Sequence, residues 1–198
     1  MSAETADRPL RRPRMTPERE RELLLHAIEA LREDGYEALS MDSVAARAHC
    51  SKATLYKQFQ TKQQMVSAAL YATRPAVDDI DTGSLRGDLL ELGARAAENY
   101  DYAQPVFAAL AHASRTDHDL VRALRETLIE PEGSLIDGFI ERAIARGELT
   151  RRPAAAAYVM RIALGTALTH PLFEEGKPDL ESVTALFDEV IIPALMNS

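Results

Sequence analysis

The chain has 198 residues, is 46% hydrophobic, contains no Trp and carries a formal net charge of -8. Its usage of Ala, Leu, Glu and Arg, with few β-branched runs, predicts an all-α protein of one domain or two small ones. One cysteine excludes an internal disulfide, and no apolar run approaches the about 18 residues of a membrane span, so we expect a cytoplasmic protein.

The negative charge is unevenly distributed along the chain. Residues 1–62 contain 11 Lys+Arg and 10 Asp+Glu, whereas residues 63–198 contain 12 and 21. The acidity therefore lies in the larger C-terminal part, which we do not expect to bind nucleic acid.

Residues 1–15 are polar and contain two prolines and four arginines, Arg8, Arg11, Arg12 and Arg14. This composition predicts a disordered basic arm. Two interpretations remain open: a solvated tail, or an arm that reaches DNA phosphates or the minor groove.

The first predicted helix begins at Thr16-Pro17, where Thr supplies an N-cap and Pro occupies the first helical position. Gly35 is the expected stop. Between them runs an apolar stripe at helical spacing, formed by Leu24, Ala27, Ile28 and Leu31.

The pattern of residues 40–62 predicts two short helices joined by a sharp turn, followed by the start of another helix. Ser40, Ser51 and Thr61 are the expected N-caps, and His49-Cys50 forms the turn. The side chains expected to pack inward are Met41, Val44, Ala45, Ala48, Leu55 and Phe59. Those left to point outward are Lys52, Ala53, Thr54, Tyr56 and Lys57.

The charge of this segment differs from that of the whole chain. Between residues 47 and 62 the only ionic side chains are Arg47, Lys52, Lys57 and Lys62. A purely cationic segment in an acidic protein indicates a local surface for an anionic partner such as DNA.

The same segment resembles the helix-turn-helix of the TetR family of bacterial transcriptional regulators. The matching residues are Ser40, Val44-Ala45, Ala48, Ser51, Thr54-Leu55-Tyr56, Phe59 and Lys62. With the preceding helix, the resemblance covers about a quarter of the chain.

Three positions depart from the family pattern. His49 stands where Gly is usual in the turn, and Cys50 where Val is usual. Asp42 stands where a basic or neutral residue is common; its carboxylate either repels phosphate or accepts a hydrogen bond from a cytosine amino group.

The resemblance implies a helix-turn-helix DNA-binding domain at residues 16–62 and a larger helical effector-binding and dimerisation domain at residues 63–198. The periodicity predicts a helix from Thr61 to Arg74, followed by a loop at residues 77–83. Because this helix runs out of the DNA-binding domain into the second domain, we expect it to carry movement from one to the other. Further helices are predicted over residues 85–102, 105–114, 116–147 with a kink or break at Pro131, 153–170 and 180–196.

The last two predicted helices, Pro153–His170 and Leu180–Met196, are unusually apolar, and residues 154–169 contain a single charge. Such helices either close the core of the monomer or pack against a second copy. We favour the homodimer, and the resemblance implies dimerisation through these two helices as a four-helix bundle.

The residues expected to contact DNA are Ser40, Ser51, Lys52, Ala53, Thr54, Tyr56, Lys57 and Lys62. Lys52 and Lys57 suit guanine edges or phosphates, and Thr54 and Ala53 suit a thymine methyl group. Tyr56 and Lys62 are expected to hold phosphates. As isolated residues the two lysines of the second helix would indicate only a solvated face, but within this motif contact with DNA is the stronger interpretation.

An effector pocket among the middle helices is implied by the resemblance. Its candidate lining is Tyr100, Tyr102, Phe107, His112, Phe139, Met160 and His170. Aromatic and Met side chains at helical spacing more often pack in a core, so core packing is the stronger interpretation of each single residue. Cys50 is either a packed residue of the turn or a redox switch.

No catalytic, metal or cofactor site is predicted. The five histidines are scattered, and the spacing of His112 and His118 with Asp117 and Asp119 matches no common zinc pattern and indicates a capped helix start. We therefore expect a protein that is not an enzyme.

Together these patterns predict a dimeric transcriptional regulator, a repressor released from its operator by a small-molecule effector. The alternative is a constitutive or architectural DNA-binding dimer without an effector.

Overall fold

The computed structural model describes residues 15–197, apart from the side chain of residue 132, and all secondary structure in that range is helical. The expected arm at residues 1–15 falls, except for Met15, outside the described residues. The α-helices in chain order are α1 Pro17–Ala38, α2 Met41–Arg47, α3 Lys52–Gln58, α4 Lys62–Thr73, α5 Leu85–Glu98, α6 Tyr100–Ala113, α7 His118–Leu124, α8 Glu130–Arg146, α9 Val159–Thr169, α10 Leu180–Ala185 and α11 Ile192–Met196.

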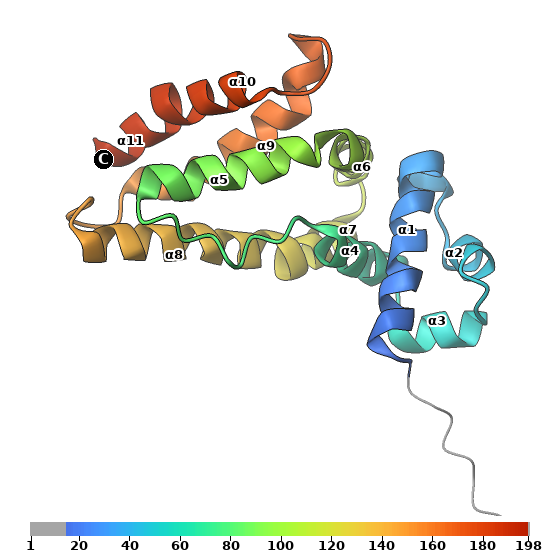
Figure 1. Ribbon diagram of the computed structural model, residues 1–198. Coiled ribbons are helices and arrows are strands. Elements are labelled where there is room, and N and C mark those ends of the chain that lie inside the picture. Colours follow the sequence, from blue (N-terminus) through green and yellow to red (C-terminus); the bar gives the residue numbers. More distant parts are fainter. Residues whose placement is uncertain (1–14, 198) are drawn as a thin grey trace, which may run out of the picture.

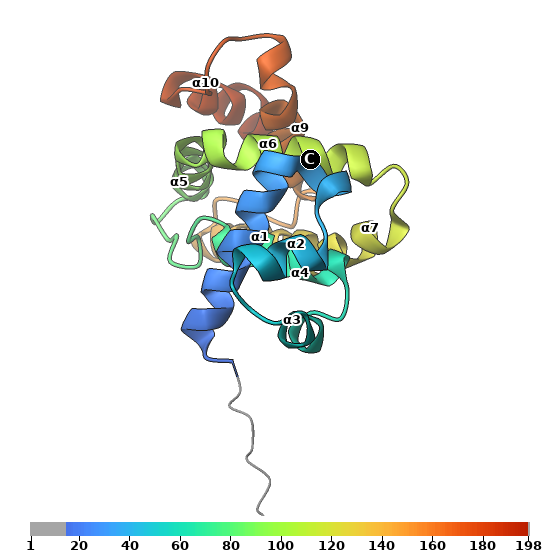
Figure 2. The same ribbon diagram turned by 90° about the vertical axis from the view of Figure 1, so that its right-hand side faces the viewer.

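The helices form two bodies along the length of the molecule. Figure 1 shows α1–α3 at one end and the layers of α8, α5 and α10–α11 at the other, with α4 and α7 between them. Turned by 90°, the molecule shows α6 crossing behind the end of α1 (Figure 2).

Two hydrophobic cores stabilise this arrangement. The first contains the buried faces of α1–α4 together with Val106 and Leu110 of α6 and Leu120 of α7. The second lies between α5, α8, α9 and the C-terminal helices and includes Phe139, which is fully buried. Because α4, α6 and α7 share the first core, α1–α3 rest directly on the C-terminal part of the chain.

A helix boundary in the middle of the chain differs from the sequence-based prediction. The helix expected to reach residue 102 ends at Glu98, and α6 begins at Tyr100, with Pro105 inside the helix rather than at its start. The turn falls at Asn99, which has φ -91° and ψ 5°. Tyr100 and Val106 are both buried on α6. Their burial keeps the segment before Pro105 helical, so Pro105 lies inside the helix rather than at its start.

The break expected at Pro131 is also absent, because the helix widens instead. Residues Arg125–Ile129 form a π-helical turn in which the Glu130 N–H donates to the carbonyl of Arg125. The last helix has the same feature: a π-helical segment, Leu186–Ile191, precedes Pro193. A wider turn relieves the clash between a proline ring and the carbonyl four residues earlier, so both helices continue.

The predicted stop at Gly147 is confirmed, since Gly147 has φ 79° in the left-handed region. The helix predicted from Pro153 begins with a 3₁₀ segment, Ala154–Tyr158, before α9. A short 3₁₀ turn, His170–Leu172, follows α9.

A buried carboxylate joins α5 to α8. Asp88 is fully buried and accepts hydrogen bonds from the N–H and hydroxyl of Thr82 at 2.7 and 2.8 Å. The Arg142 guanidinium lies 3.0 Å from its other oxygen. Burial alone would raise the pKa of Asp88, but these hydrogen bonds and the charge of Arg142 outweigh it, so the pKa is lowered.

Candidate nucleic-acid interface

Each of α2, α3 and α4 begins at a hydroxyl side chain that caps it. Ser40 accepts from the Ser43 N–H at 3.0 Å, and Ser51 accepts from the Thr54 N–H at 3.1 Å. Thr61 caps α4 by accepting from the Gln64 N–H at 3.2 Å. All three predicted N-caps are confirmed, and each satisfies a backbone donor that the helix cannot pair internally.

His49 is the described non-glycine residue with positive φ, at 46°. This conformation lets the chain reverse between α2 and α3, and the Cys50 N–H closes the turn by donating to the carbonyl of Ala45 at 3.0 Å. The turn therefore has the geometry for which Gly is usual, at some conformational cost to His49.

The predicted inner face of the motif is confirmed. Val44 and Leu55 have no exposed surface, and Phe59 is 6% exposed. These side chains anchor α2 and α3 to α1 and α4, with the remaining buried positions Met41, Ala45 and Ala48. As a result, one face of α3 is held inward and the other is left in solvent.

The outer face of α3 carries every predicted contact residue of that helix. Ser51, Lys52, Ala53, Thr54, Tyr56 and Lys57 are all exposed. The Ser51 and Thr54 hydroxyls are joined at 2.7 Å, so the cap also orients the Thr54 side chain. A rigid helix with small, hydroxyl and cationic side chains on one exposed face has the chemistry needed to approach base edges and phosphates.

The four cations of the segment are not equivalent. Arg47 bonds to Glu33 at 2.6 Å and to Asp34 at 2.8 Å, and Lys52 lies 2.5 Å from Asp42. Within residues 15–197, the Lys57 ammonium has no hydrogen-bond or ion-pair partner. Lys57 is therefore the cation of α3 that needs to give up no protein contact to meet an anion.

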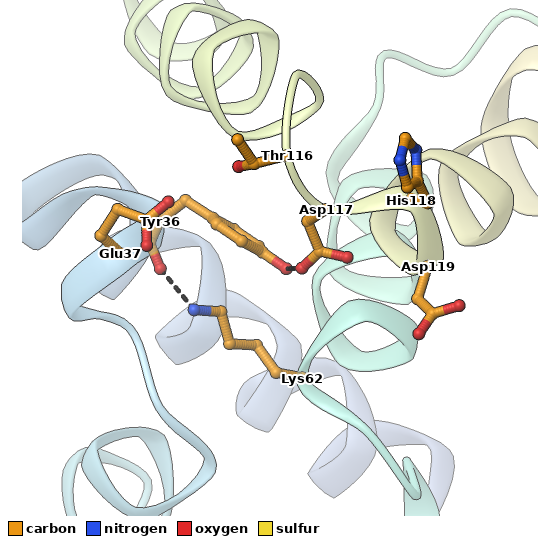
Figure 3. A pocket seen from close by; sticks show the side chains of 7 residues that line it. All are labelled: Tyr36, Glu37, Lys62, Thr116, Asp117, His118 and Asp119. Carbon is orange, nitrogen blue, oxygen red and sulfur yellow. Dashed lines mark hydrogen bonds between the residues drawn. The ribbon is translucent and has the colours of Figure 1, made fainter.

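Lys62 faces a different part of the molecule. Its ammonium donates to the Tyr36 carbonyl at 2.6 Å and lies 3.9 Å from the centre of the Tyr36 ring. Lys62 lines a hollow of about 440 Å³ together with Tyr36 and the start of α7. Figure 3 shows its ammonium beside the Tyr36 backbone. Burial lowers the pKa of Lys62, although Glu37 and Asp117 oppose this effect. A phosphate contact by Lys62 stays a prediction.

Tyr36 and Asp117 of this hollow and the neighbouring Gln63 form a contact that sequence reasoning missed. The Tyr36 hydroxyl and the Gln63 side-chain amide both donate to Asp117. Asp117 was predicted only as a helix cap, a role it also has. No local pattern in the sequence indicates the contact with Tyr36, because the two residues are 81 positions apart.

The seven predicted effector-pocket residues do not come together. Tyr100 and His170 are in contact, with ring centres 5.7 Å apart, and Phe139 and Met160 belong to the second core. Tyr102 and Phe107 pack against the first core, and His112 is exposed. Neither the hollow at Lys62 nor a second one of about 330 Å³ beside Arg95 is lined by any of the seven.

The described residues also bear on three other features: a metal site, a membrane span and a reactive cysteine. No group of three or more His, Cys, Asp or Glu within them is arranged to hold a metal ion. None of their helices is both long and apolar enough to span a membrane. Cys50 is a free, half-buried thiol.

A capped helix-turn-helix with an exposed second helix, joined to a larger helical domain, defines a DNA-binding transcriptional regulator. Comparison with protein families agrees with this architecture. Residues 23–69 match the family described as bacterial regulatory proteins, tetR family. Residues 79–190 match the tetracyclin repressor-like C-terminal domain. The chain belongs to the TetR family of helix-turn-helix transcriptional regulators, which are not enzymes.

Relatives cover almost the whole chain. A DNA-binding transcriptional repressor TetR of Mycobacteroides abscessus is 34% identical over 173 residues, covering 86% of this chain and 90% of the relative. An uncharacterised HTH-type transcriptional regulator of Mycobacterium tuberculosis is 33% identical over 195 residues, covering 98% of this chain and 95% of the relative.

Solved structures share the fold. A putative TetR-family regulator from Rhodococcus sp. has a TM-score of 0.68 at 20% identity, covering 91% of this chain and 100% of that one. The transcriptional regulator FadR from Bacillus subtilis, solved in complex with stearoyl-CoA, has a TM-score of 0.65 at 14% identity, covering 89% and 98%.

Proposed function

We propose that the chain is a cytoplasmic homodimeric repressor that binds an operator through α3 and leaves it when a small-molecule effector binds the C-terminal domain. The observation that carries the DNA-binding part is the exposed face of α3, on which Lys57 has no hydrogen-bond or ion-pair partner among residues 15–197. In this proposal the two α3 helices of a dimer enter successive major grooves, about 34–36 Å apart.

Within that contact, the predicted roles of individual residues follow from their chemistry. Lys57 reaches a guanine edge or a phosphate, and Thr54 and Ala53 approach a thymine methyl group. Tyr56 and Lys62 hold phosphates, and Lys52 reaches a guanine edge or a phosphate once it leaves Asp42.

The homodimer is supported by unburied apolar surface on the last helices. In α9 only Val159 is buried, and α10 has no buried residue. The exposed apolar side chains of this region include Tyr158, Leu180, Val190 and Met196. A surface of this kind is stabilised by a second copy of the same helices.

Effector release is supported by the shared core of α4, α6 and α7. A ligand that moves the C-terminal helices would move α4 with them, and so change the separation of the two α3 helices. The alternative, a constitutive or architectural dimer without an effector, is favoured by the separation of the predicted pocket residues: Tyr102 and Phe107 pack against the first core, Phe139 and Met160 belong to the second, and His112 is exposed.

The DNA-binding experiment measures affinity for the duplex just upstream of the chain's own coding region, from 50 to 200 mM salt. We expect tight, salt-steep binding that Lys57→Ala weakens about fivefold or more. Lys177→Ala, an exposed lysine between α9 and α10, is the matched control and should bind as the wild type does. Equal, weak binding to every duplex, including those selected from random DNA, would contradict the proposal.

The dimer is tested by sedimentation equilibrium of Val190→Asp. Val190 is 48% exposed in the monomer, so a charge there costs little unless a second copy covers it. We expect this variant to be monomeric, and the control Ile129→Asp, at 46% exposed, to remain dimeric. A dimeric Val190 variant would exclude this interface.

The effector is sought by screening small molecules for a rise in the thermal midpoint of the wild type. A compound that raises the midpoint and releases the upstream duplex supports the repressor mechanism. A chain whose DNA affinity changes with none of them is the constitutive binder.

A further inference from the structure

One carboxylate of the C-terminal part is bonded to both ends of the segment that carries α2 and α3. Asp117 Oδ2 accepts from the Tyr36 hydroxyl at 2.7 Å and from Gln63 Nε2 at 2.8 Å. Tyr36 lies just before α2, and Gln63 lies in the first turn of α4, just after α3. Figure 3 shows the Tyr36 ring extending across the hollow to the Asp117 carboxylate.

The groups that meet Asp117 are themselves held in place. Tyr36 is 5% exposed, so packing defines the position of its ring. Lys62 covers that ring and bonds to the Tyr36 carbonyl, which ties the two ends of the α2–α3 segment to each other. The carboxylate of Asp117 thus contacts a preformed junction rather than two independent side chains.

We infer that Asp117 is a positioning residue for DNA recognition: its hydrogen bonds set the orientation of the α2–α3 unit relative to the C-terminal domain. This inference rests on the proposed function. The apolar contacts of α1 and α4 with α6 and α7 hold the unit to the domain, and the Ser67 hydroxyl of α4 donates to the Ala123 carbonyl of α7 at 2.7 Å; the bonds to Asp117 add two directional contacts beside Tyr36 and Gln63. Hydrogen bonds weaken steeply when their angle changes, so they restrict rotation at this junction.

The chemistry of the site requires an aspartate. Three donors converge on it, because Asp117 Oδ1 also accepts from the Leu120 N–H at 2.8 Å as the N-cap of α7. Two carboxylate oxygens satisfy all three donors. A serine at position 117 would still cap α7, but it would leave Tyr36 and Gln63 without an acceptor.

In a dimer, orientation determines which spacing of half-sites both α3 helices reach together. One inserted base pair moves a half-site by about 3.4 Å along the duplex, so a rigid junction makes binding sensitive to spacing. If the junction is loosened, affinity falls for the duplex with the best half-site spacing and stays the same for duplexes with other spacings.

The test uses the full chain and a duplex selected from random DNA by the wild type, together with versions that have one base pair inserted or removed between the half-sites. We expect Asp117→Ser and Tyr36→Phe each to lose about fivefold affinity for the best spacing. Affinity for the altered spacings and for random duplex should stay near that of the wild type, so the preference for one spacing falls about fivefold.

Asp137→Ser is the matched control, because it makes the same Asp-to-Ser change on α8, outside the proposed dimer surface, where Asp137 pairs with Arg152. It should keep the wild-type spacing preference. Unchanged preference in both test variants, or an equal loss on every duplex that follows a loss of folded protein, would overturn the positioning role. A wild type that binds all duplexes alike would overturn the proposed function, and this inference with it.

Discussion

Asp42 lies beside the first residue of α3, and we expect Asp42→Asn to raise affinity for DNA of any sequence. In the free protein its carboxylate is paired with the Lys52 ammonium. The substitution removes one negative charge from the predicted DNA-binding surface and frees Lys52 for a phosphate.

The magnitude follows from the exposure of the pair. The Lys52 and Asp42 side chains are 65% and 53% exposed, so their ion pair is worth about 0.2–1 kcal/mol. One additional phosphate contact steepens the dependence of log K on log salt by about 0.9. Between 50 and 200 mM salt the variant should therefore lose about 3.5-fold more affinity than the wild type loses.

Fluorescence anisotropy with a random-sequence duplex and with the selected site measures the slope of log K against log salt for the wild type and for the variant. Asp137→Asn is the control: it breaks an ion pair with Arg152 and changes net charge equally, but Asp137 belongs to α8. We expect the selectivity for the chosen site to fall only in the Asp42 variant, because sequence-independent attraction rises there. An unchanged slope for Asp42→Asn, or an equal change for Asp137→Asn, would refute the role of the pair.

Three further predictions concern stability, measured by urea unfolding at one protomer concentration. Asp88→Asn should lower the free energy of unfolding by about 2–3 kcal/mol at pH 7, since it removes the carboxylate that bonds to Arg142. Because folding lowers the pKa of Asp88, its carboxylate stabilises the fold above the ordinary Asp pKa, and this stabilisation is lost as pH falls through the pKa of the folded state. The difference in unfolding free energy between wild type and Asp88→Asn should therefore shrink in acid. A difference that does not change with pH would contradict this role of Asp88. Gly93→Ala should cost about 1–3 kcal/mol, because a Cβ atom would lie 2.5 Å from the buried Phe187 ring; an unchanged midpoint would show that the Leu186–Ile191 segment moves freely. Gly35→Ala should lower the free energy of unfolding by about 1–3 kcal/mol through the φ of 77° alone, since no atom of the described residues lies within 4 Å of the new methyl group. A more stable variant would show that the backbone at residue 35 relaxes.

The helix-turn-helix was predictable from the sequence because its signals are local. A cap such as Ser40 or Ser51 bonds to a backbone group three residues away, and Leu55 and Phe59 share a face through helical periodicity alone. These short-range rules hold whatever the rest of the chain does, and the exposed face of α3 follows from them.

Prolines and helix ends were less predictable. Pro131 and Pro193 follow widened π-helical turns and Pro105 lies inside α6, because tertiary packing keeps these helices continuous. Local propensity indicates a break at such residues, but burial of the surrounding apolar faces outweighs it.

The sequence by itself determined the class of fold, the caps and the exposed recognition helix, since each depends on residues within a few positions of one another. Only the tertiary structure decided which cations are already paired, and that the expected pocket residues are divided between two separate cores and the surface. It alone brought Tyr36 to Asp117 across 81 residues of chain. The physical reason is that such contacts depend on how whole helices pack, and no local period in the sequence encodes that distance.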